Sequence, residues 1–133
     1  FNHKSQQLVE TEMAEILVLD DVYDACILIQ KILSRQGHKI HTFTEEEDTI
    51  RFAQKNRIDL AILDIKLKKM SGIDVLAELK RIQPEIKVII LTGYPTAETA
   101  RDALSFGANE YCVKPIDKED LERKVEQVLQ LKI

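Results

Sequence analysis

The sequence is poor in glycine, proline and cysteine and has no long apolar run. Only four glycines and three prolines occur among its 133 residues, which excludes collagen-like and low-complexity chains. The two cysteines, Cys26 and Cys112, fall in apolar stretches without the spacing of a metal site, so we expect ordinary buried thiols. No stretch is long enough to cross a membrane and no secretory signal is recognisable, so the cytoplasm is the expected compartment.

Positive charges are slightly fewer than negative ones. The chain has 19 Lys and Arg against 23 Asp and Glu, a net charge of −4 at pH 7, and this balance disfavours direct nucleic-acid binding. The basic run "KLKK" at 66–69 is better explained as solvated loop charge. Hydrophobic residues make up 44% and charged residues 32%, a composition typical of a soluble globular domain with no membrane partner.

The first residues differ from the rest. The stretch 1–14 is mostly polar, begins with Phe and shows no clear period, which predicts an N-terminal extension, native or artificial, with Met13 as a candidate natural start. The remaining stretch, 15–133, has no internal linker or repeat and has the length of one ordinary domain. An output domain, where one exists, is expected outside this chain.

Short apolar, β-rich runs alternate with stretches of helical period along this domain. The runs predict strands over 15–20, 39–43, 59–64, 87–92 and 110–113. Three of them are almost continuously apolar, as expected for strands that are covered on both faces of a parallel sheet. Five strand–helix units predict an α/β fold with a doubly wound five-stranded parallel sheet in the flavodoxin-like order 2-1-3-4-5, in a single domain.

The helices carry recognisable start signals. A helical apolar stripe covers 22–36, and capping-box patterns at Thr44 with Glu47 and at Ser71 with Asp74 predict the starts of the second and third helices. The fourth helix is predicted to open at Pro95 and Thr96 and to stop at Gly107, and Asp117 is predicted to cap the fifth.

Polar residues follow the strands where each strand ends. Asp20 and Asp21 end the first strand, Asp64 the third and Thr92 the fourth, and Lys114 follows the fifth. Because strands 1 and 3 are neighbours in the predicted order, the three carboxylates are expected to converge at one edge of the sheet.

Three clustered carboxylates repel one another unless a cation lies among them. A hard divalent cation such as Mg2+ prefers oxygen ligands, accepts one or two carboxylates and can bind a phosphate oxygen. The hydroxyl of Thr92 and the ammonium of Lys114 are suited to a phosphoryl group, and Asp64 is then a candidate nucleophile. Taken singly, such residues are more often helix caps, turn residues or surface lysines, so the interpretation depends on their joint occurrence.

Four segments resemble the receiver domain of two-component response regulators, over about residues 15–131. They are "ILVLDD", "DLAILDIKLKKMSGIDVL", "VIILTGY" and "ANEYCVKPID". The resemblance implies that Asp64 accepts a phosphoryl group from the phosphohistidine of a sensor histidine kinase or phosphotransfer protein. It implies that Asp21 and Asp64 bind Mg2+ directly together with the main-chain carbonyl of Lys66, and that Asp20 holds the ion mainly through water.

The resemblance also assigns the remaining site residues. Lys114 and Thr92 are expected to contact phosphoryl oxygens, and the bond between Lys114 and Pro115 is expected to be cis. Tyr111 matches the aromatic switch position of the family. Together with Thr92 it is expected to respond to phosphorylation and to alter the face made by the fourth predicted helix, the strand over 110–113 and the fifth predicted helix. This face is also a candidate contact between two copies of the chain.

The sequence departs from the family pattern at two places. Lys68 stands where the family often has Pro, which predicts a more mobile loop after Asp64, and Val22 replaces a frequent third acidic residue. Neither change removes a metal ligand. Lys66 and Tyr94 occupy positions that flank the phosphorylation site in receivers, so we expect their bulk to restrict water attack and to prolong the phosphorylated state.

Two other classes of function compete with a phosphorylated switch. A pseudo-receiver would use the same fold as a constitutive docking surface, and a Mg2+-dependent phosphohydrolase would turn over an external phosphoester. The phosphohydrolase is disfavoured because Lys66 stands where a second carboxylate is typical, two residues after Asp64. A flavin-mononucleotide carrier is weaker still, since "DDVYD" would repel a phosphate. The expected activity is therefore limited to self-catalysed phosphotransfer and autodephosphorylation, without enzymatic turnover.

Overall fold

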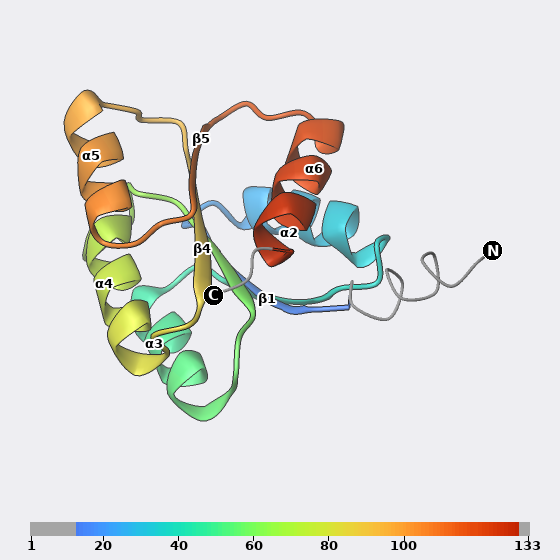
Figure 1. Cartoon of the computed structure of the whole chain (residues 1–133), viewed down its shortest axis with the longest axis horizontal. Coiled ribbons are helices and arrows are strands. Elements are labelled where there is room, and N and C mark those ends of the chain that lie inside the picture. The colour runs from blue at the N-terminus through green and yellow to red at the C-terminus, as the bar shows by residue number, and fades with distance from the viewer. Residues whose placement is uncertain (1–12, 131–133) are drawn as a thin grey trace.

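The computed structural model describes residues 13–130, which form one parallel sheet with helices on both faces (Figure 1). The strands are β1 (Glu15–Leu19), β2 (Lys39–Phe43), β3 (Leu60–Leu63), β4 (Lys87–Thr92) and β5 (Glu110–Val113). The helices are α2 (Tyr23–Ser34), α3 (Glu46–Lys55), α4 (Gly72–Ile82), α5 (Ala97–Ser105) and α6 (Lys118–Leu129). Of the predicted extension over 1–14, only Met13 and Ala14 lie within the described residues, and the side chain of Ala14 is buried.

The sheet has the predicted order. Its five strands run β2-β1-β3-β4-β5, and every neighbouring pair is parallel. All five predicted strands are present, although those predicted over 15–20 and 59–64 are shorter by one and two residues. The central pair β1 and β3 is in register at Leu19 and Leu63, so both strands end at the same level. This shared end is where ligands are expected in an open α/β sheet.

Two hydrophobic layers enclose the sheet because side chains of a strand alternate between its faces. Leu17 and Leu19 of β1 pack on the face covered by α3, α4 and α5. Ile16 and Val18 pack on the opposite face, against α2 and α6. Figure 1 shows the two groups of helices on either side of the strands. The near-continuous apolar runs of the sequence are therefore strands that are buried on both sides.

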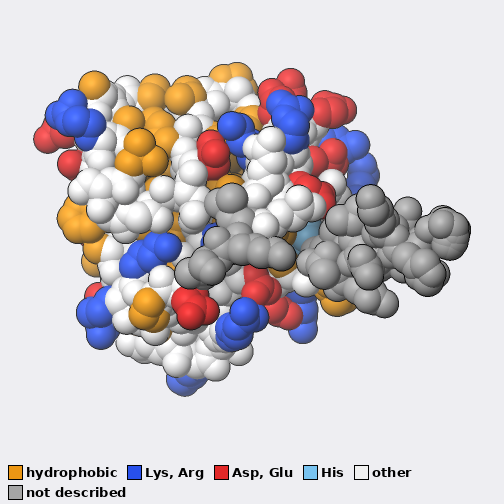
Figure 2. Space-filling view, in the orientation of Figure 1, with side chains coloured by type: hydrophobic (Ala, Val, Ile, Leu, Met, Phe, Trp, Pro, Cys, Tyr) orange, Lys and Arg blue, Asp and Glu red, His pale blue; other side chains and the backbone are white. Residues whose placement is uncertain are grey.

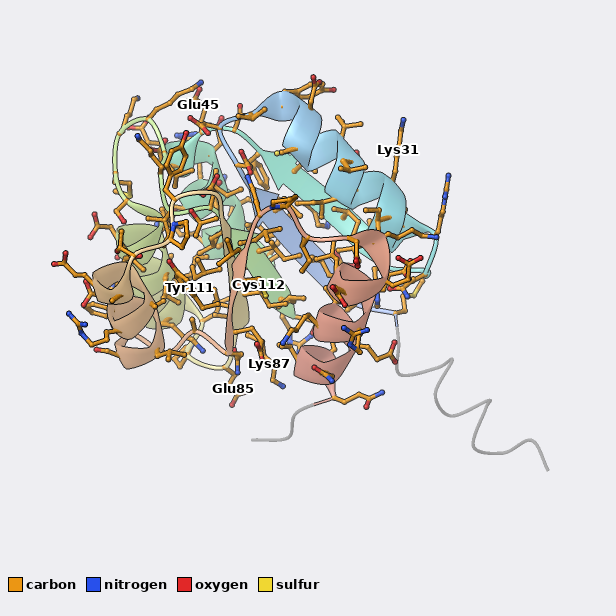
Figure 3. All side chains as sticks on the ribbon, turned by 90° about the horizontal axis from the view of Figure 1, so that it is seen from above. Lys31, Glu45, Glu85, Lys87, Tyr111 and Cys112 are labelled. Carbon is orange, nitrogen blue, oxygen red and sulfur yellow. The ribbon has the colours of Figure 1, made fainter. Side chains whose placement is uncertain are left out.

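The neighbouring residues Tyr111 and Cys112 of β5 illustrate the same alternation (Figure 3). Tyr111 packs toward the layer of α3, α4 and α5, and Cys112 lies in the layer of α2 and α6. Cys26 and Cys112 are both buried and make no disulfide, as predicted. Figure 3 also places Glu45 near one end of the sheet and Lys87, where β4 begins, near the other.

Most of the predicted helix signals are confirmed. Ser71 and Asp74 form a capping box at the start of α4, Thr96 caps α5, and the Asp117 side chain accepts a hydrogen bond from the main-chain N–H of Asp120. Gly107 follows α5 with a φ of 100°, a left-handed conformation that glycine adopts without steric strain.

The capping box predicted at Thr44 and Glu47 is wrong. The N-cap of α3 is Glu45, whose backbone is extended and whose side chain makes no capping hydrogen bond. The helix begins one residue later than the pattern requires, so Glu47 does not occupy the third helical position. Acidic residues in the first turn of α3 still favour the positive end of the helix dipole.

The visible surface carries charges of both signs. Figure 2 shows acidic and basic side chains interspersed over the viewed face rather than gathered into a patch of one sign. Within residues 13–130, no helix combines the length and the apolar character that crossing a membrane requires.

Candidate functional site

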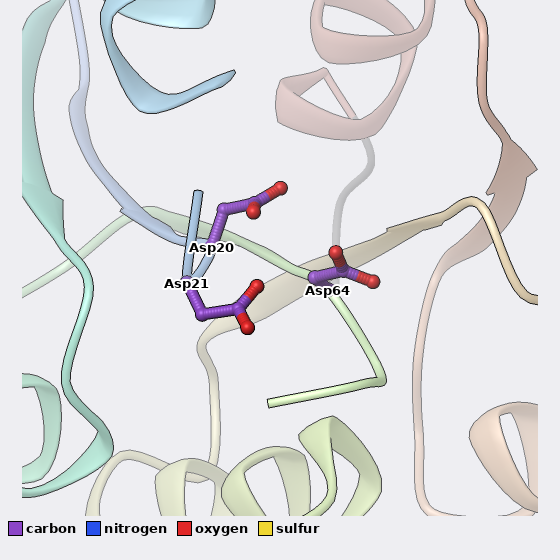
Figure 4. A group of neighbouring side chains, drawn as sticks. All are labelled: Asp20, Asp21 and Asp64. Atoms are coloured by element: carbon purple, nitrogen blue, oxygen red, sulfur yellow. The ribbon is translucent and has the colours of Figure 1, made fainter. Parts of the chain in front are cut away.

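Three carboxylates meet at the carboxyl ends of β1 and β3. One oxygen from each of Asp20, Asp21 and Asp64 lies within 4.8 Å of the others. Figure 4 shows Asp20 and Asp21 side by side after β1, with Asp64 opposite them after β3. Asp20 and Asp64 are 2% and 5% exposed, whereas Asp21 is half-buried. The predicted convergence of the three residues is therefore present.

Main-chain hydrogen bonds fix the two buried aspartates just beyond the strands. The N–H of Asp20 donates to the carbonyl oxygen of Phe43 at 3.1 Å, and the N–H of Asp64 donates to that of Leu19 at 3.0 Å. One carboxylate oxygen of Asp20 accepts the N–H of Val22 at 2.9 Å, and one of Asp64 accepts the N–H of Ile65 at 2.7 Å. Each buried aspartate thus has one oxygen held by the backbone and a second oxygen for other partners.

Lys114 supplies the positive charge of the cluster. Its Nζ lies 2.5 Å from Oδ2 of Asp20 and 3.1 Å from Oδ2 of Asp64. The main-chain N–H of Lys114 donates to the carbonyl oxygen of Thr92 at 2.8 Å, and the bond to Pro115 is cis, as expected. A single ammonium therefore bridges the ends of β1 and β3 from the end of β5.

Burial and charge act on both partners of this contact. Burial raises the pKa of Asp20 above its ordinary value, and the hydrogen bond from Lys114 offsets this only in part. Burial lowers the pKa of Lys114, but its hydrogen bonds to Asp20 and Asp64 and their negative charges together outweigh burial, so this pKa lies above its ordinary value. The ammonium therefore keeps its proton, and this single positive charge faces three carboxylates.

The comparison with known proteins identifies the family. A model described as the response regulator receiver domain matches residues 16–126. The chain belongs to this family. The sporulation initiation phosphotransferase F of Bacillus subtilis (strain 168) is 30% identical over 118 residues, which cover 89% of this chain and 95% of that protein.

Longer relatives contain the receiver as one part. The transcriptional regulatory protein ZraR of Escherichia coli (strain K12) is 33% identical over 115 residues, which cover 86% of this chain but 26% of that protein. The chain thus spans about a quarter of the length of such regulators. Among solved structures, a CheY-like receiver domain protein from Methanospirillum hungatei JF-1 superposes with a TM-score of 0.86 at 28% identity, covering 88% of this chain and 94% of that one.

The two remaining predicted receiver residues lie on the neighbouring strands β4 and β5. Thr92 is fully buried at the end of β4, and its Oγ1 accepts the main-chain N–H of Tyr94 at 3.1 Å. Tyr111 of β5 packs on the layer of α3, α4 and α5, and its hydroxyl oxygen lies 2.9 Å from Oγ1 of Thr99. The neighbouring strands β4 and β5 therefore carry both residues of the predicted switch, with Thr92 at the end of β4 and Tyr111 opposite Ile90.

Lys66 and Tyr94, which were predicted to flank the receiver site, contact each other. The ammonium nitrogen of Lys66 lies 4.4 Å from the centre of the Tyr94 ring, within the range of a cation–π interaction. The sequence indicated the two positions but not this contact. Together they join the loop after Asp64 to the loop after β4.

Gly72 lies against Asp64, a contact that the sequence did not indicate. A Cβ at this position would lie 1.9 Å from the carbonyl oxygen of Asp64, and the Gly72 N–H donates to the carbonyl oxygen of Ile65 at 2.8 Å. Only glycine permits this close approach between the start of α4 and the main chain of Asp64. The only available signal was a glycine directly after the Ser71 cap, which is not specific.

Lys68, which replaces a frequent proline of the family, pairs with Glu45 through Nζ at 3.0 Å. The increased mobility expected of this loop stays a prediction.

Proposed function

We propose that this receiver domain is a phosphorylation-activated signalling switch with Asp64 as its phosphoacceptor. The proposal rests above all on the position of the Asp64 carboxylate, 3.1 Å from Lys114 Nζ and beside the carboxylates of Asp20 and Asp21. Its expected donor is the phosphohistidine of a sensor histidine kinase or of a phosphotransfer protein.

In the transfer, an oxygen of the Asp64 carboxylate attacks the phosphorus and a new O–P bond forms. The P–N bond of the donor breaks, and its electron pair stays on the imidazole nitrogen, which takes up a proton. Lys114 and the Thr92 hydroxyl are proposed to contact the phosphoryl oxygens, on which the charge of the transition state develops. This step needs no general base to activate the nucleophile, because the nucleophile is a carboxylate rather than a hydroxyl or a thiol.

The acidic cluster fits a Mg2+ ion. Its donors are all carboxylate oxygens within 4.8 Å of one another, the ligand type that this ion prefers. We assign Asp21, Asp64 and the main-chain carbonyl of Lys66 as direct ligands, with Asp20 acting mainly through water. When bound, Mg2+ neutralises charge on the phosphoryl oxygens and the carboxylates.

The phosphorylated state is proposed to be relayed through Thr92 and Tyr111 to the face formed by α5, β5 and α6. This face is the proposed contact for an output domain outside this chain or for a second copy of the chain. We also propose that the domain turns over no external substrate, and that its only reactions are phosphotransfer and autodephosphorylation.

Incubation with acetyl phosphate and Mg2+ tests the function without a cognate kinase. The chain is expected to gain one phosphoryl group, detected by intact mass, and Asp64→Asn is expected to gain none. Equal labelling of the Asp64→Asn variant would reject Asp64 as the acceptor. Absence of labelling of the unmodified chain, with its fold intact, would favour the pseudo-receiver.

A further inference from the structure

Glu46 is a buried carboxylate that lies outside the acidic cluster. It is the first residue of α3, and it is only 2% exposed. Its Oε2 accepts the main-chain N–H of Lys69 at 2.6 Å and that of Met70 at 3.0 Å. Both donors belong to the loop between β3 and α4, which begins at the phosphoacceptor. Helix α3 therefore holds the loop that follows β3, the next strand along the chain.

The burial of Glu46 is unfavourable for stability and is not explained by helix capping. Among residues 13–130, its Oε1 is the one buried side-chain oxygen or nitrogen without a hydrogen-bond partner, and such an atom is unfavourable for stability. The N-cap of α3 is Glu45, not Glu46. This unfavourable burial allows Glu46 to accept the two hydrogen bonds from the loop backbone.

Main-chain hydrogen bonds hold the backbone of the β3–α4 loop at two places, and Lys66 lies between them. At the first, the N–H of Gly72 donates to the carbonyl oxygen of Ile65 at 2.8 Å, which closes the base of the loop. At the second, Glu46 holds the backbone of Lys69 and Met70. The stretch from Lys66 to Lys68 runs between these two anchors.

Two ion pairs join the same helix and loop, but they are exposed. Lys68 pairs with Glu45 at 3.0 Å and Lys69 with Glu47 at 3.4 Å. Exposed pairs of this kind contribute little, because water and salt screen them and two flexible side chains must be ordered. Charge-assisted hydrogen bonds that a buried carboxylate accepts are stronger, so Glu46 is the principal tie between α3 and the loop.

We propose that Glu46 is a positioning residue for the phosphorylation site. By fixing the backbone of Lys69 and Met70, it fixes the segment that precedes them and thereby the main-chain carbonyl of Lys66. It touches neither the metal nor the phosphoryl group, and it sets the Mg2+ affinity through the loop. The inference rests on the proposed function, in which that carbonyl is a metal ligand.

Mg2+ titration by calorimetry, together with amide hydrogen exchange at Lys69 and Met70, tests the proposal on the full chain. Glu46→Ala is expected to weaken Mg2+ binding about tenfold, the scale typical of residues that orient a metal ligand, and to speed exchange at both amides. Glu46→Gln is expected to restore most of the affinity, because its amide oxygen can accept the same two hydrogen bonds. Where the alanine variant does not fold, Glu46→Asp, which is one methylene shorter, carries the same expectation of weaker binding.

Glu47→Ala is the matched control. It removes the same charge from the same helical turn, but it disrupts only an exposed ion pair, so its Mg2+ affinity is expected to equal that of the unmodified chain. Equal weakening in Glu46→Ala and Glu47→Ala would trace the effect to charge and overturn the positioning role. A Glu46→Ala variant that is less stable but binds Mg2+ normally would also overturn it.

Failure of the proposed function has a different outcome. A chain that takes no phosphoryl group from acetyl phosphate, but whose Mg2+ affinity falls in Glu46→Ala alone, rejects the switch and supports the positioning role. A chain that binds no Mg2+ rejects both.

Discussion

The hydroxyl oxygen of Tyr111 lies 2.9 Å from Oγ1 of Thr99, the residue that completes the capping box of α5. Thr99 shares this box with Thr96, whose side chain accepts the main-chain N–H of Thr99 at 3.0 Å. The proposed aromatic switch is thereby linked to the first turn of the helix whose surface it is expected to change. A rotation of the Tyr111 ring would break this link, so the hydrogen bond favours the orientation seen here.

Tyr111→Phe removes the hydroxyl and keeps the ring. We expect the free energy of unfolding to fall by about 1 kcal/mol, the typical net contribution of one hydrogen bond. Amide chemical shifts in α5 are expected to move toward those of the phosphorylated chain. Thr99→Val should have a similar effect, and the double variant should be less destabilised than the sum of the two, because both remove the same bond. If the double variant lost the exact sum of the two single losses in free energy of unfolding, the hydrogen bond would not couple Tyr111 and Thr99.

Gly72→Ala places a methyl group against the main chain of Asp64. The nearest atom would be the Asp64 carbonyl oxygen at 1.9 Å, so the loop or α4 must shift. We expect a loss of about 1–3 kcal/mol in the free energy of unfolding, as for other overpacked sites, and slower phosphorylation. Gly93→Ala is the control in denaturant unfolding, since a Cβ there meets its nearest atoms at 4.0 Å. An equal loss in both variants would contradict the close-approach explanation.

The order of the sheet and the meeting of Asp20, Asp21 and Asp64 were predictable for a simple reason. Strand identity follows from local apolar runs, and the chirality and order of successive strand–helix units leave few arrangements. A residue at a strand's carboxyl end is then placed by the fold itself.

The contacts that refine the site were not predictable in this way. They depend on the path of loops and on side-chain rotamers. Examples are the approach of Gly72 to Asp64, the hydrogen bonds that Glu46 accepts from the loop, and the contact of Lys66 with Tyr94. No period in the sequence encodes these features. The wrong capping box at Thr44 has the same origin, since a shift of one residue in a helix start changes every capping position.

The pairing of Lys114 with Asp20 predicts a stability loss at alkaline pH. The pKa of Lys114 is raised above its ordinary 10.5 in the folded chain, so its contribution is fully present below that value and is lost as pH rises through the folded pKa. Lys114→Ala is expected to lose about 2 kcal/mol of unfolding free energy at neutral pH, in the range for a hydrogen bond to a charged group. Denaturant unfolding in Mg2+-free buffer at several alkaline pH values should show a smaller difference between the two proteins as pH increases. A constant difference would contradict the linkage.

The contact between Lys66 and Tyr94 predicts a slow loss of the phosphoryl group. If these side chains restrict water, Lys66→Ala and Tyr94→Ala should each speed autodephosphorylation by about tenfold, equivalent to about 1.4 kcal/mol of barrier. The double variant should be little faster than either single one, because the ammonium and the ring act as one contact. The decay of the phosphorylated chain, followed by intact mass after removal of acetyl phosphate, measures these rates. Unchanged rates in both single variants would show that the pair does not shield the site.

Mg2+ itself should stabilise the fold through the acidic cluster. A ligand that binds only the folded state at a hundredfold excess over its dissociation constant adds about 2.7 kcal/mol to the free energy of unfolding. We expect a gain of this size in the unmodified chain and little gain in Asp21→Ala or in Asp64→Ala, because both carboxylates are proposed as direct ligands. Asp20→Ala should keep part of the gain, since that residue is proposed to act mainly through water. A full gain in Asp64→Ala together with none in Asp21→Ala would place the ion away from the phosphoacceptor and contradict a shared site.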